Sequence, residues 1–211
     1  MKILVLGASR GIGKEVTKAA LAAGYSVRAF SRGAADMPTA AGLEPWPGDA
    51  TRAEDLEPAL EGVDAVVSAL GITESLKMIW QEVTLFSTST AALIPLMETK
   101  GPDRLICVTG IASGTSKSAL SKIERMGHWA LLSKPYEDKD RQEALVRASS
   151  LRWTLVRPTI LTNGKPTARY KVLTDPKDWR MGMISRADVA DFVLRALVDD
   201  GFVGADPVIT R

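Results

Sequence analysis

The stretch that decides the fold is residues 1–32, MKILVLGASRGIGKEVTKAALAAGYSVRAFSR. It begins with a short apolar run, Lys2–Leu6, which is typical of a strand buried on both faces of a parallel sheet. A glycine-rich run, residues 7–13, follows at once, and apolar residues then recur at helical spacing as far as Gly24. A second strand is predicted over Ser26–Ser31. The pattern predicts a strand–helix–strand unit with glycines in its first turn.

That glycine turn has the chemistry of a pyrophosphate site. We expect Gly7 to permit the tight turn, Gly11 to let the backbone approach phosphates, and Gly13 to let the helix pack against the strand. Free N–H groups and a partial positive charge at the helix N-terminus favour an anion there. The alternative is a glycine-rich turn that only connects strand to helix. The position of the turn, directly between a strand and a helix, favours the dinucleotide interpretation.

The end of the second strand predicts which dinucleotide is bound. An NAD-binding unit usually places Asp or Glu there to hold the ribose 2′-hydroxyl. This chain has Ser31 and Arg32 instead, and a guanidinium can bind a 2′-phosphate with two hydrogen bonds. Arg10, inside the glycine turn, is a second candidate for that phosphate, and the alternative for both arginines is a solvated surface charge. We therefore predict NADP(H) as the cofactor.

Strands and helices alternate along the rest of the chain. Further strands are predicted at residues 43–47, 65–70, 104–109, 151–157, 169–173 and 206–210, and helices at 51–60, 80–100, 136–149 and from 185 onward. This alternation predicts one α/β domain over residues 1–211 with a doubly wound, mostly parallel sheet. We expect about seven strands in the order 3-2-1-4-5-6-7, so that the first strand lies inside the sheet. Residues 110–135 and 159–184 are predicted to form the loops on the substrate side.

Two helix starts carry capping-box patterns. Thr51 is the predicted N-cap of one helix, with Glu54 as its acidic partner. Ser185 is the predicted N-cap of another, with Asp188 in the same role.

Ligands of doubly wound sheets bind at the carboxyl ends of the strands, where the strand order reverses. The small-residue turns after the first, second and fourth strands should line that edge. Asp49, after the third strand, could accept a hydrogen bond from the adenine amino group, or it could be an ordinary turn residue. The predicted cofactor-binding residues are Gly7, Ser9, Arg10, Gly11, Ile12, Gly13, Ser31, Arg32, Asp49, Ala50, Ala69, Leu70, Gly71, Thr109, Pro158 and Thr159.

The composition fits a globular protein whose partners are small molecules. The chain is 45% hydrophobic and 25% charged, and its net charge of +2 is too small to predict binding to nucleic acid or to an anionic membrane. No apolar run approaches the ~20 residues of a membrane helix. With Cys107 as the only cysteine and no visible signal peptide, we expect a cytoplasmic protein. One histidine and one cysteine do not supply the usual zinc ligands, so no metal is predicted. The oligomeric state is left open.

The chain resembles the atypical short-chain dehydrogenase/reductases in a series of motifs: GASRGIG, GDATRAEDLEPAL, GVDAVVSALG, RLICVTG, LRWTLVRPTILTNG and ISRADVADFVLRAL. Within that group it is most similar to the NAD(P)-binding branch of biliverdin reductase B-type flavin reductases and NmrA-like proteins. The resemblance implies a Rossmann fold, NADP(H) binding and, often, reduction of flavins, quinones or similar conjugated molecules. The chain departs from that branch at Gly110, where the flavin reductases commonly have a serine, and at Arg10, where a glycine is more usual.

The sequence marks no catalytic residue clearly. The Tyr-x-x-x-Lys motif of the tyrosine-dependent dehydrogenases is absent. Tyr136 and Lys139 are three residues apart and could share a helix face, or they could belong to a solvated first helical turn. Thr109 is a third weak candidate. The apolar residues around His128, namely Met126, Trp129, Leu131 and Leu132, could cover the acceptor or merely anchor a loop.

Two functions follow from these observations. The first is an NADPH-dependent oxidoreductase that transfers a hydride to a flavin, a quinone or a similar conjugated acceptor. For such an acceptor we expect direct transfer without a tyrosine acid. The second is a non-catalytic NADP(H)-binding sensor or partner-binding protein of the NmrA-like type.

Overall fold

A computed structural model of the chain describes residues 1–72, 83–119 and 122–211, the side chains of residues 117–133 excepted. Its centre is an eight-stranded sheet in the order β3-β2-β1-β4-β5-β6-β10-β8, parallel except for the antiparallel pairing of β8 with β10. β7 and β9 form a separate parallel pair. The strands are β1 (Lys2–Leu6), β2 (Ser26–Ser31), β3 (Leu43–Pro47), β4 (Ala65–Ser68), β5 (Arg104–Val108), β6 (Arg152–Pro158), β7 (Ile160–Thr162), β8 (Lys171–Leu173), β9 (Met183–Ser185) and β10 (Val208–Thr210).

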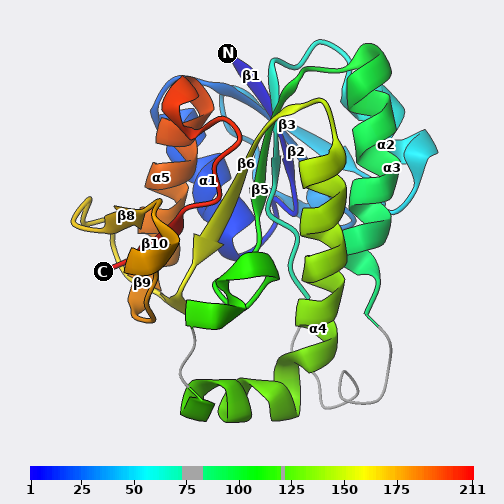
Figure 1. The fold of residues 1–211 in the computed structure, drawn as a ribbon. Helices are drawn as coiled ribbons and strands as arrows, with labels where there is room; N and C mark the ends of the chain where they lie inside the picture. Colours follow the sequence, from blue (N-terminus) through cyan, green and yellow to red (C-terminus); the bar gives the residue numbers. More distant parts are fainter. Residues whose placement is uncertain (73–82, 120–121) are drawn as a thin grey trace.

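Helices cover both faces of the sheet, with α1 and α5 on one side and α2, α3 and α4 on the other (Figure 1). The helices are α1 (Gly11–Ala22), α2 (Ala53–Ala59), α3 (Leu85–Lys100), α4 (Lys122–Ala148) and α5 (Arg186–Val198), with short 3₁₀ turns at Ala34–Asp36, Gly114–Ala119, Pro176–Asp178 and Asp200–Phe202. In β1, Ile3 and Val5 enter the core under α1 and α5, whereas Leu4 and Leu6 enter the opposite core. A strand buried on both faces needs this near-continuous apolar sequence.

The predicted fold class and strand order are confirmed. β1 lies inside the sheet between β2 and β4, and β3 forms one edge. The edge position suits β3 because Pro45 and Pro47 have no N–H to donate to a further strand. The antiparallel β8, which lies within the short strand predicted at residues 169–173, extends the opposite edge. The carboxyl ends of β1, β2, β4 and β5 therefore face the same edge, as a dinucleotide site requires.

The prediction that residues 110–135 are mostly irregular is wrong. A 3₁₀ turn at Gly114–Ala119 and the first turns of α4 occupy much of this segment. Figure 1 shows α4 as a bent helix. Pro135 lies inside it and has no N–H for the helical ladder, which explains a bend without loss of the helix. Within the described chain, no helix has both the length and the apolar character needed to cross a membrane.

Three smaller differences concern helix starts and short strands. The predicted helix at 80–100 is helical from Leu85, and residues 80–82 lie outside the described part of the chain. The Thr51 capping box is wrong, because Thr51 donates to Asp49 and α2 begins two residues later. The Ser185 cap is confirmed: its hydroxyl oxygen accepts the Asp188 N–H at 3.0 Å. The β7–β9 pair is an addition to the turns predicted for residues 159–184.

Candidate functional site

The glycine turn after β1 has the backbone geometry that the sequence predicts. Gly7 adopts φ 84° and Gly11 φ 57°, in the left-handed region that favours glycine. A Cβ atom at Gly13 would lie 2.2 Å from the carbonyl oxygen of Gly7, so only glycine allows α1 to approach β1 this closely. Space is open around Gly11, where no atom lies within 4 Å of an added Cβ. The turn therefore combines tight packing under the helix with an accessible backbone above it.

The start of α1 is suited to an anion. Arg10 occupies the N-cap position and makes no side-chain capping hydrogen bond, and the first turn of the helix contains no acidic residue. The first N–H groups of a helix need an acceptor from outside the helix. Backbone N–H groups and the helix dipole thus favour a phosphate group at this position.

One cavity of about 1040 Å³ runs along the carboxyl edge of the sheet. It is continuous from the glycine turn past the ends of β2, β4 and β5 to α4 and to the start of α5. The predicted cofactor residues that line it are Gly7, Ser9, Arg10, Gly11, Ile12, Ser31, Arg32, Asp49, Ala50, Ala69, Leu70, Gly71 and Thr109. A cavity therefore lies at the edge of the sheet where the sequence predicts ligand binding.

Three predicted cofactor residues are not among the described lining residues. Gly13 lies beneath the glycine turn and acts through packing. Pro158 is the last residue of β6, and the buried Thr159 hydroxyl lies 3.1 Å from the hydroxyl of Thr210 on β10. We predicted that Pro158 and Thr159 line the cavity, but Pro158 pairs with Ile209 of β10 and the Thr159 N–H donates to the Ile209 carbonyl oxygen, so both residues continue the sheet.

At the β2 end of the cavity, Ser31 and Arg32 lie beside Asp49. The Ser31 hydroxyl oxygen is buried without a hydrogen-bond partner, which leaves a polar group available to a ligand. Arg32 is exposed and forms no ion pair within the described chain. Asp49 accepts the N–H of Thr51 at 3.0 Å and its hydroxyl at 2.8 Å. These hydrogen bonds lower the pKa of Asp49, and the charge of Arg32 adds a smaller effect in the same direction. The same bonds give Asp49 a structural role in the turn, whether or not it also binds adenine.

At the opposite end, the three weak catalytic candidates come together. The Lys139 ammonium donates to the carbonyl oxygen of Thr109 at 2.6 Å, and its Nζ lies 5.9 Å from the ring centroid of Tyr136. Tyr136 and Lys139 are well inside α4, so the interpretation of a solvated first turn is wrong. Burial lowers the pKa of Lys139 to about 8, against weaker opposing effects of Cys107 and Glu143.

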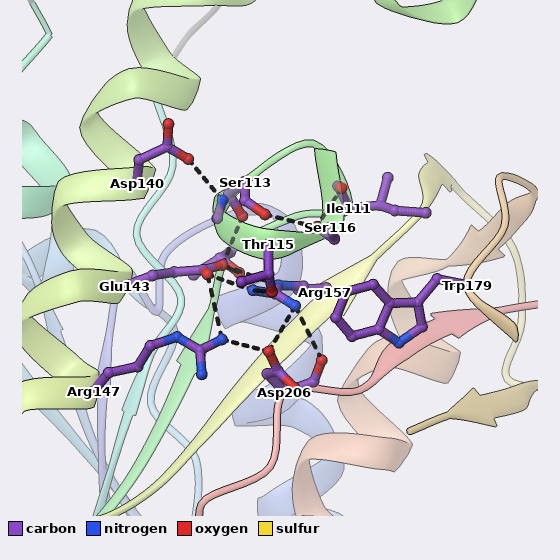
Figure 2. Close-up of polar contacts among 12 residues, drawn as sticks. Ile111, Ser113, Thr115, Ser116, Asp140, Glu143, Arg147, Arg157, Trp179 and Asp206 are labelled. Carbon is purple, nitrogen blue, oxygen red and sulfur yellow. Dashed lines mark hydrogen bonds and ion pairs between the residues drawn. The ribbon is translucent and has the colours of Figure 1, made fainter. Parts of the chain in front are cut away.

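A buried carboxylate that the sequence analysis missed holds Thr109. Glu143 Oε1 accepts the hydroxyls of Thr109 at 2.8 Å and Ser113 at 2.7 Å, and Glu143 Oε2 accepts Arg157 Nη2 at 2.5 Å (Figure 2). Burial acts to raise the pKa of Glu143, but the hydrogen bonds and charge of Arg157 outweigh it and hold the pKa below its ordinary value. The available sequence signal was Arg157 itself, because an arginine inside an apolar strand needs a buried partner.

Asp138 is a second missed carboxylate. It lies buried on α4 and accepts the N–H of Phe86 at 2.7 Å, at the start of α3. Met126, His128, Trp129, Leu131 and Leu132 have side chains outside the described residues, so their predicted places stay predictions. Among the described residues, no group of three or more His, Cys, Asp or Glu could hold a metal ion.

Comparison with known proteins decides the family. The sequence profile of the NAD(P)H-binding family matches residues 7–200. The chain belongs to this family. The match covers the glycine turn and every described residue of the cavity from Gly7 to Arg186, so dinucleotide binding rests on both sequence and geometry. The resemblance to the atypical short-chain dehydrogenase/reductases is confirmed at this level.

Solved structures of other proteins have the same fold. ChuY of Escherichia coli O157:H7, described as an anaerobillin reductase, is 21% identical with a TM-score of 0.79, over 100% of this chain and 97% of that one. The oxidoreductase YlbE of Lactococcus lactis is 19% identical with a TM-score of 0.84, over 100% and 91%. A short-chain dehydrogenase/reductase of Veillonella parvula in complex with NADP is 17% identical with a TM-score of 0.83, over 100% and 94%. At these identities the likeness shows the fold.

The residues of this family member fit an NAD(P) dinucleotide. The open backbone at Gly11 and the helix start would hold the pyrophosphate. The orphaned Ser31 hydroxyl has the position and the unused hydrogen-bonding capacity expected for contact with the adenosine ribose.

Proposed function

We propose that this protein is an NADPH-dependent reductase that transfers a hydride to a flavin, a quinone or a similar conjugated acceptor. The observation that carries the proposal is one continuous cavity that is lined both by the glycine turn and by Phe86, Tyr136 and Leu161. One end suits phosphates, and the other suits a flat apolar molecule. ChuY, described as a reductase, and the Veillonella protein with NADP support the same combination.

NADPH rather than NADH is proposed because of the residues at the end of β2. A carboxylate there would repel a 2′-phosphate, whereas Arg32 is a cation without an acidic partner within 4.0 Å in the described chain. The Ser31 hydroxyl adds an unused hydrogen-bonding group next to it.

Hydride transfer to a flavin or a quinone depends more on the orientation of the two reactants than on a proton donor in the protein. When bound, NADPH supplies the hydride. A flavin or quinone spreads the resulting charge over its ring system, and solvent can then supply the proton. The chain would have to orient the nicotinamide against the acceptor. The Glu143–Thr109 hydrogen bond and the Lys139 contact with the Thr109 carbonyl fix the end of β5 beside the cavity for this purpose.

The experiment is an NADPH-oxidation screen of the purified protein with FMN, FAD and quinones, together with equilibrium binding of NADPH and NADH. Oxidation of NADPH by at least one of these acceptors supports the reductase. Tight NADP(H) binding without turnover across these acceptors would instead favour the non-catalytic sensor.

Tyr136→Phe tests the mechanism. If no tyrosine acid is needed, the variant keeps most of its activity toward flavins or quinones and binds NADPH as before. Tyr170→Phe is the matched control, because that hydroxyl bonds to Asp191 on α5 and Tyr170 is not among the described lining residues of the cavity. A loss of about a hundredfold or more in Tyr136→Phe alone, with nucleotide affinity intact, would show that Tyr136 is a general acid.

A further inference from the structure

The charge of the cavity is unbalanced. Among the described residues that line it, Arg10, Arg32, Lys139 and Arg186 are basic and Asp49 is the one acid. The proposed function uses Arg32 near the 2′-phosphate of the dinucleotide, and Arg10 at the start of α1 is the second candidate for that phosphate. Lys139 is held by the carbonyl oxygen of Thr109. Arg186 remains, and it forms no ion pair with an acidic side chain in the part of the chain that the structure describes.

The β7–β9 pair holds Arg186 in place. Its register pairs Thr162 with Ser185, so the next residues along, Asn163 and Arg186, also come side by side. The Asn163 side-chain oxygen accepts a hydrogen bond from Arg186 Nη1 at 2.8 Å. The Ser185 cap fixes the start of α5 at the same point. The backbone and a neighbouring amide thus hold the Arg186 side chain in place beside the cavity that this residue lines.

The charge of Arg186 is oriented but not neutralised. An amide oxygen is uncharged, and within the described chain Arg186 makes no ion pair with a carboxylate. The side chain is also half-buried, so water compensates its charge only in part. A guanidinium in this state binds a phosphate or carboxylate group well, through two parallel hydrogen bonds.

Arg186 comes from a different part of the chain than the residues proposed for the dinucleotide. It lines the cavity together with Leu161 of β7, whereas the residues proposed for the adenosine and the pyrophosphate follow β1, β2 and β3. We propose that Arg186 binds an anionic substituent of the acceptor, so that the natural acceptor is a conjugated molecule carrying a phosphate or a carboxylate. This inference rests on the proposed function and adds the substrate class to it.

The test compares acceptors that share a ring system and differ by one anionic group. FMN and riboflavin differ by a phosphate, and a carboxymethyl derivative of menadione differs from menadione by a carboxylate. Binding to the protein–NADP⁺ complex is measured at equilibrium, and kcat/KM is measured separately for any acceptor that turns over. The variants are Arg186→Gln, which removes the charge, and Arg186→Lys, which keeps it. Arg195→Gln removes one charge from the exposed far end of the same helix as a control.

The expected result is that the wild-type protein binds the anionic member of at least one pair about 10- to 100-fold more tightly than the neutral member. Arg186→Gln should remove this preference, Arg186→Lys should retain part of it, and Arg195→Gln should leave it intact. NADP⁺ affinity should be the same in all four proteins. The pair that shows the preference identifies the anion as a phosphate or a carboxylate.

Three results would overturn the inference. The preference could persist in Arg186→Gln, the variant could weaken both members of a pair equally, or it could weaken NADP⁺ instead, which would assign Arg186 to the dinucleotide. Failure of the proposed function has a different signature. Arg186-dependent binding of the anionic acceptor without any NADPH oxidation would overturn the reductase and leave the anion site standing.

Discussion

At the scale of single residues, Arg32 is expected to set the preference between the two dinucleotides. A charge-assisted hydrogen bond contributes about 1.5–3 kcal/mol, or roughly 10- to 150-fold in affinity. Arg32→Ala should therefore weaken NADPH binding by that factor and leave NADH nearly unchanged, as measured by equilibrium titration.

Arg52→Ala is the matched control for Arg32, because Arg52 is an exposed arginine near the same edge that pairs with Glu54. It should change neither affinity. Equal losses for NADPH and NADH in Arg32→Ala would mean that the arginine is structural.

Lys139 predicts a pH dependence of stability. Burial lowers its pKa from an ordinary 10.5 to about 8 in the folded protein. Between these two values the unfolded chain binds more protons than the folded protein, so the free energy of unfolding should rise with pH, by at most about 1.4 kcal/mol per pH unit. Urea unfolding across this window checks the rise, which Lys139→Met should remove.

Lys18→Met, at an exposed lysine of α1, is the control for Lys139→Met and should keep the wild-type slope. The prediction fails if the two variants show the same dependence on pH.

At the scale of elements, the start of α3 depends on a side chain from α4. Thr84, the N-cap residue of α3, makes no side-chain capping bond. Asp138 on α4 accepts the N–H groups of Phe86 at 2.7 Å and Ser87 at 3.3 Å instead. The cap thus ties together two helices on the same face of the sheet, next to residues that line the cavity.

Asp138→Ala should lower the free energy of unfolding by about 1–3 kcal/mol, since it leaves buried N–H groups without an acceptor. Urea unfolding measures this loss. Glu137→Ala, at the exposed neighbouring position, should stay within about 0.5 kcal/mol of the wild type. If both variants have the same stability, Asp138 does not cap α3.

At the scale of the whole molecule, Glu143 and Arg157 join parts of the chain that are distant in sequence. Arg157 of β6 is fully buried and bonds both to Glu143 of α4 and to Asp206 before β10, while its guanidinium lies 5.0 Å from the ring centroid of Trp179 (Figure 2). The Gly114 turn packs against the same carboxylate: a Cβ there would lie 2.1 Å from Glu143 Oε2.

Removing one partner of this buried pair should be costly. Arg157→Met leaves the Glu143 carboxylate buried beside fewer donors and should reduce stability by about 3–5 kcal/mol, measured by urea unfolding. The double variant Glu143→Leu, Arg157→Met should cost less than Arg157→Met alone. Lys100→Met, which breaks the exposed pair with Glu57, should leave the stability nearly unchanged. If the double variant is no more stable than Arg157→Met, the buried unpaired carboxylate of Glu143 is not the cause of the stability loss.

The lowered pKa of Glu143 also predicts how the stability of the folded protein changes in acid. The pKa of Glu143 is lowered in the folded state, so its contribution is fully present above the ordinary value of 4.5 and is lost as the pH falls through the lowered value. In Arg157→Met this part of the acid sensitivity should shrink.

The sequence by itself determined the sheet and the dinucleotide end of the site. Lys2–Leu6 and the glycine turn act through local chemistry, namely an apolar strand and backbone freedom, and local chemistry can be predicted from neighbouring residues. The role proposed for Ser31 and Arg32 rests on side-chain charge, which is also a local property. The strand order followed because short connections between alternating strands and helices leave few topologies.

Only the tertiary structure determined the end of the cavity that lies away from the glycine turn. Residues 110–135 contain Gly127 and Pro135, which locally favour a loop, yet the segment is largely helical. Glu143 meets Thr109 and Arg157, and Asp138 meets the start of α3, across separations that no local pattern encodes. The same holds for Arg186, which depends on the pairing of β7 with β9. Buried charges need partners, but only the packing of the chain determines which residues those partners are.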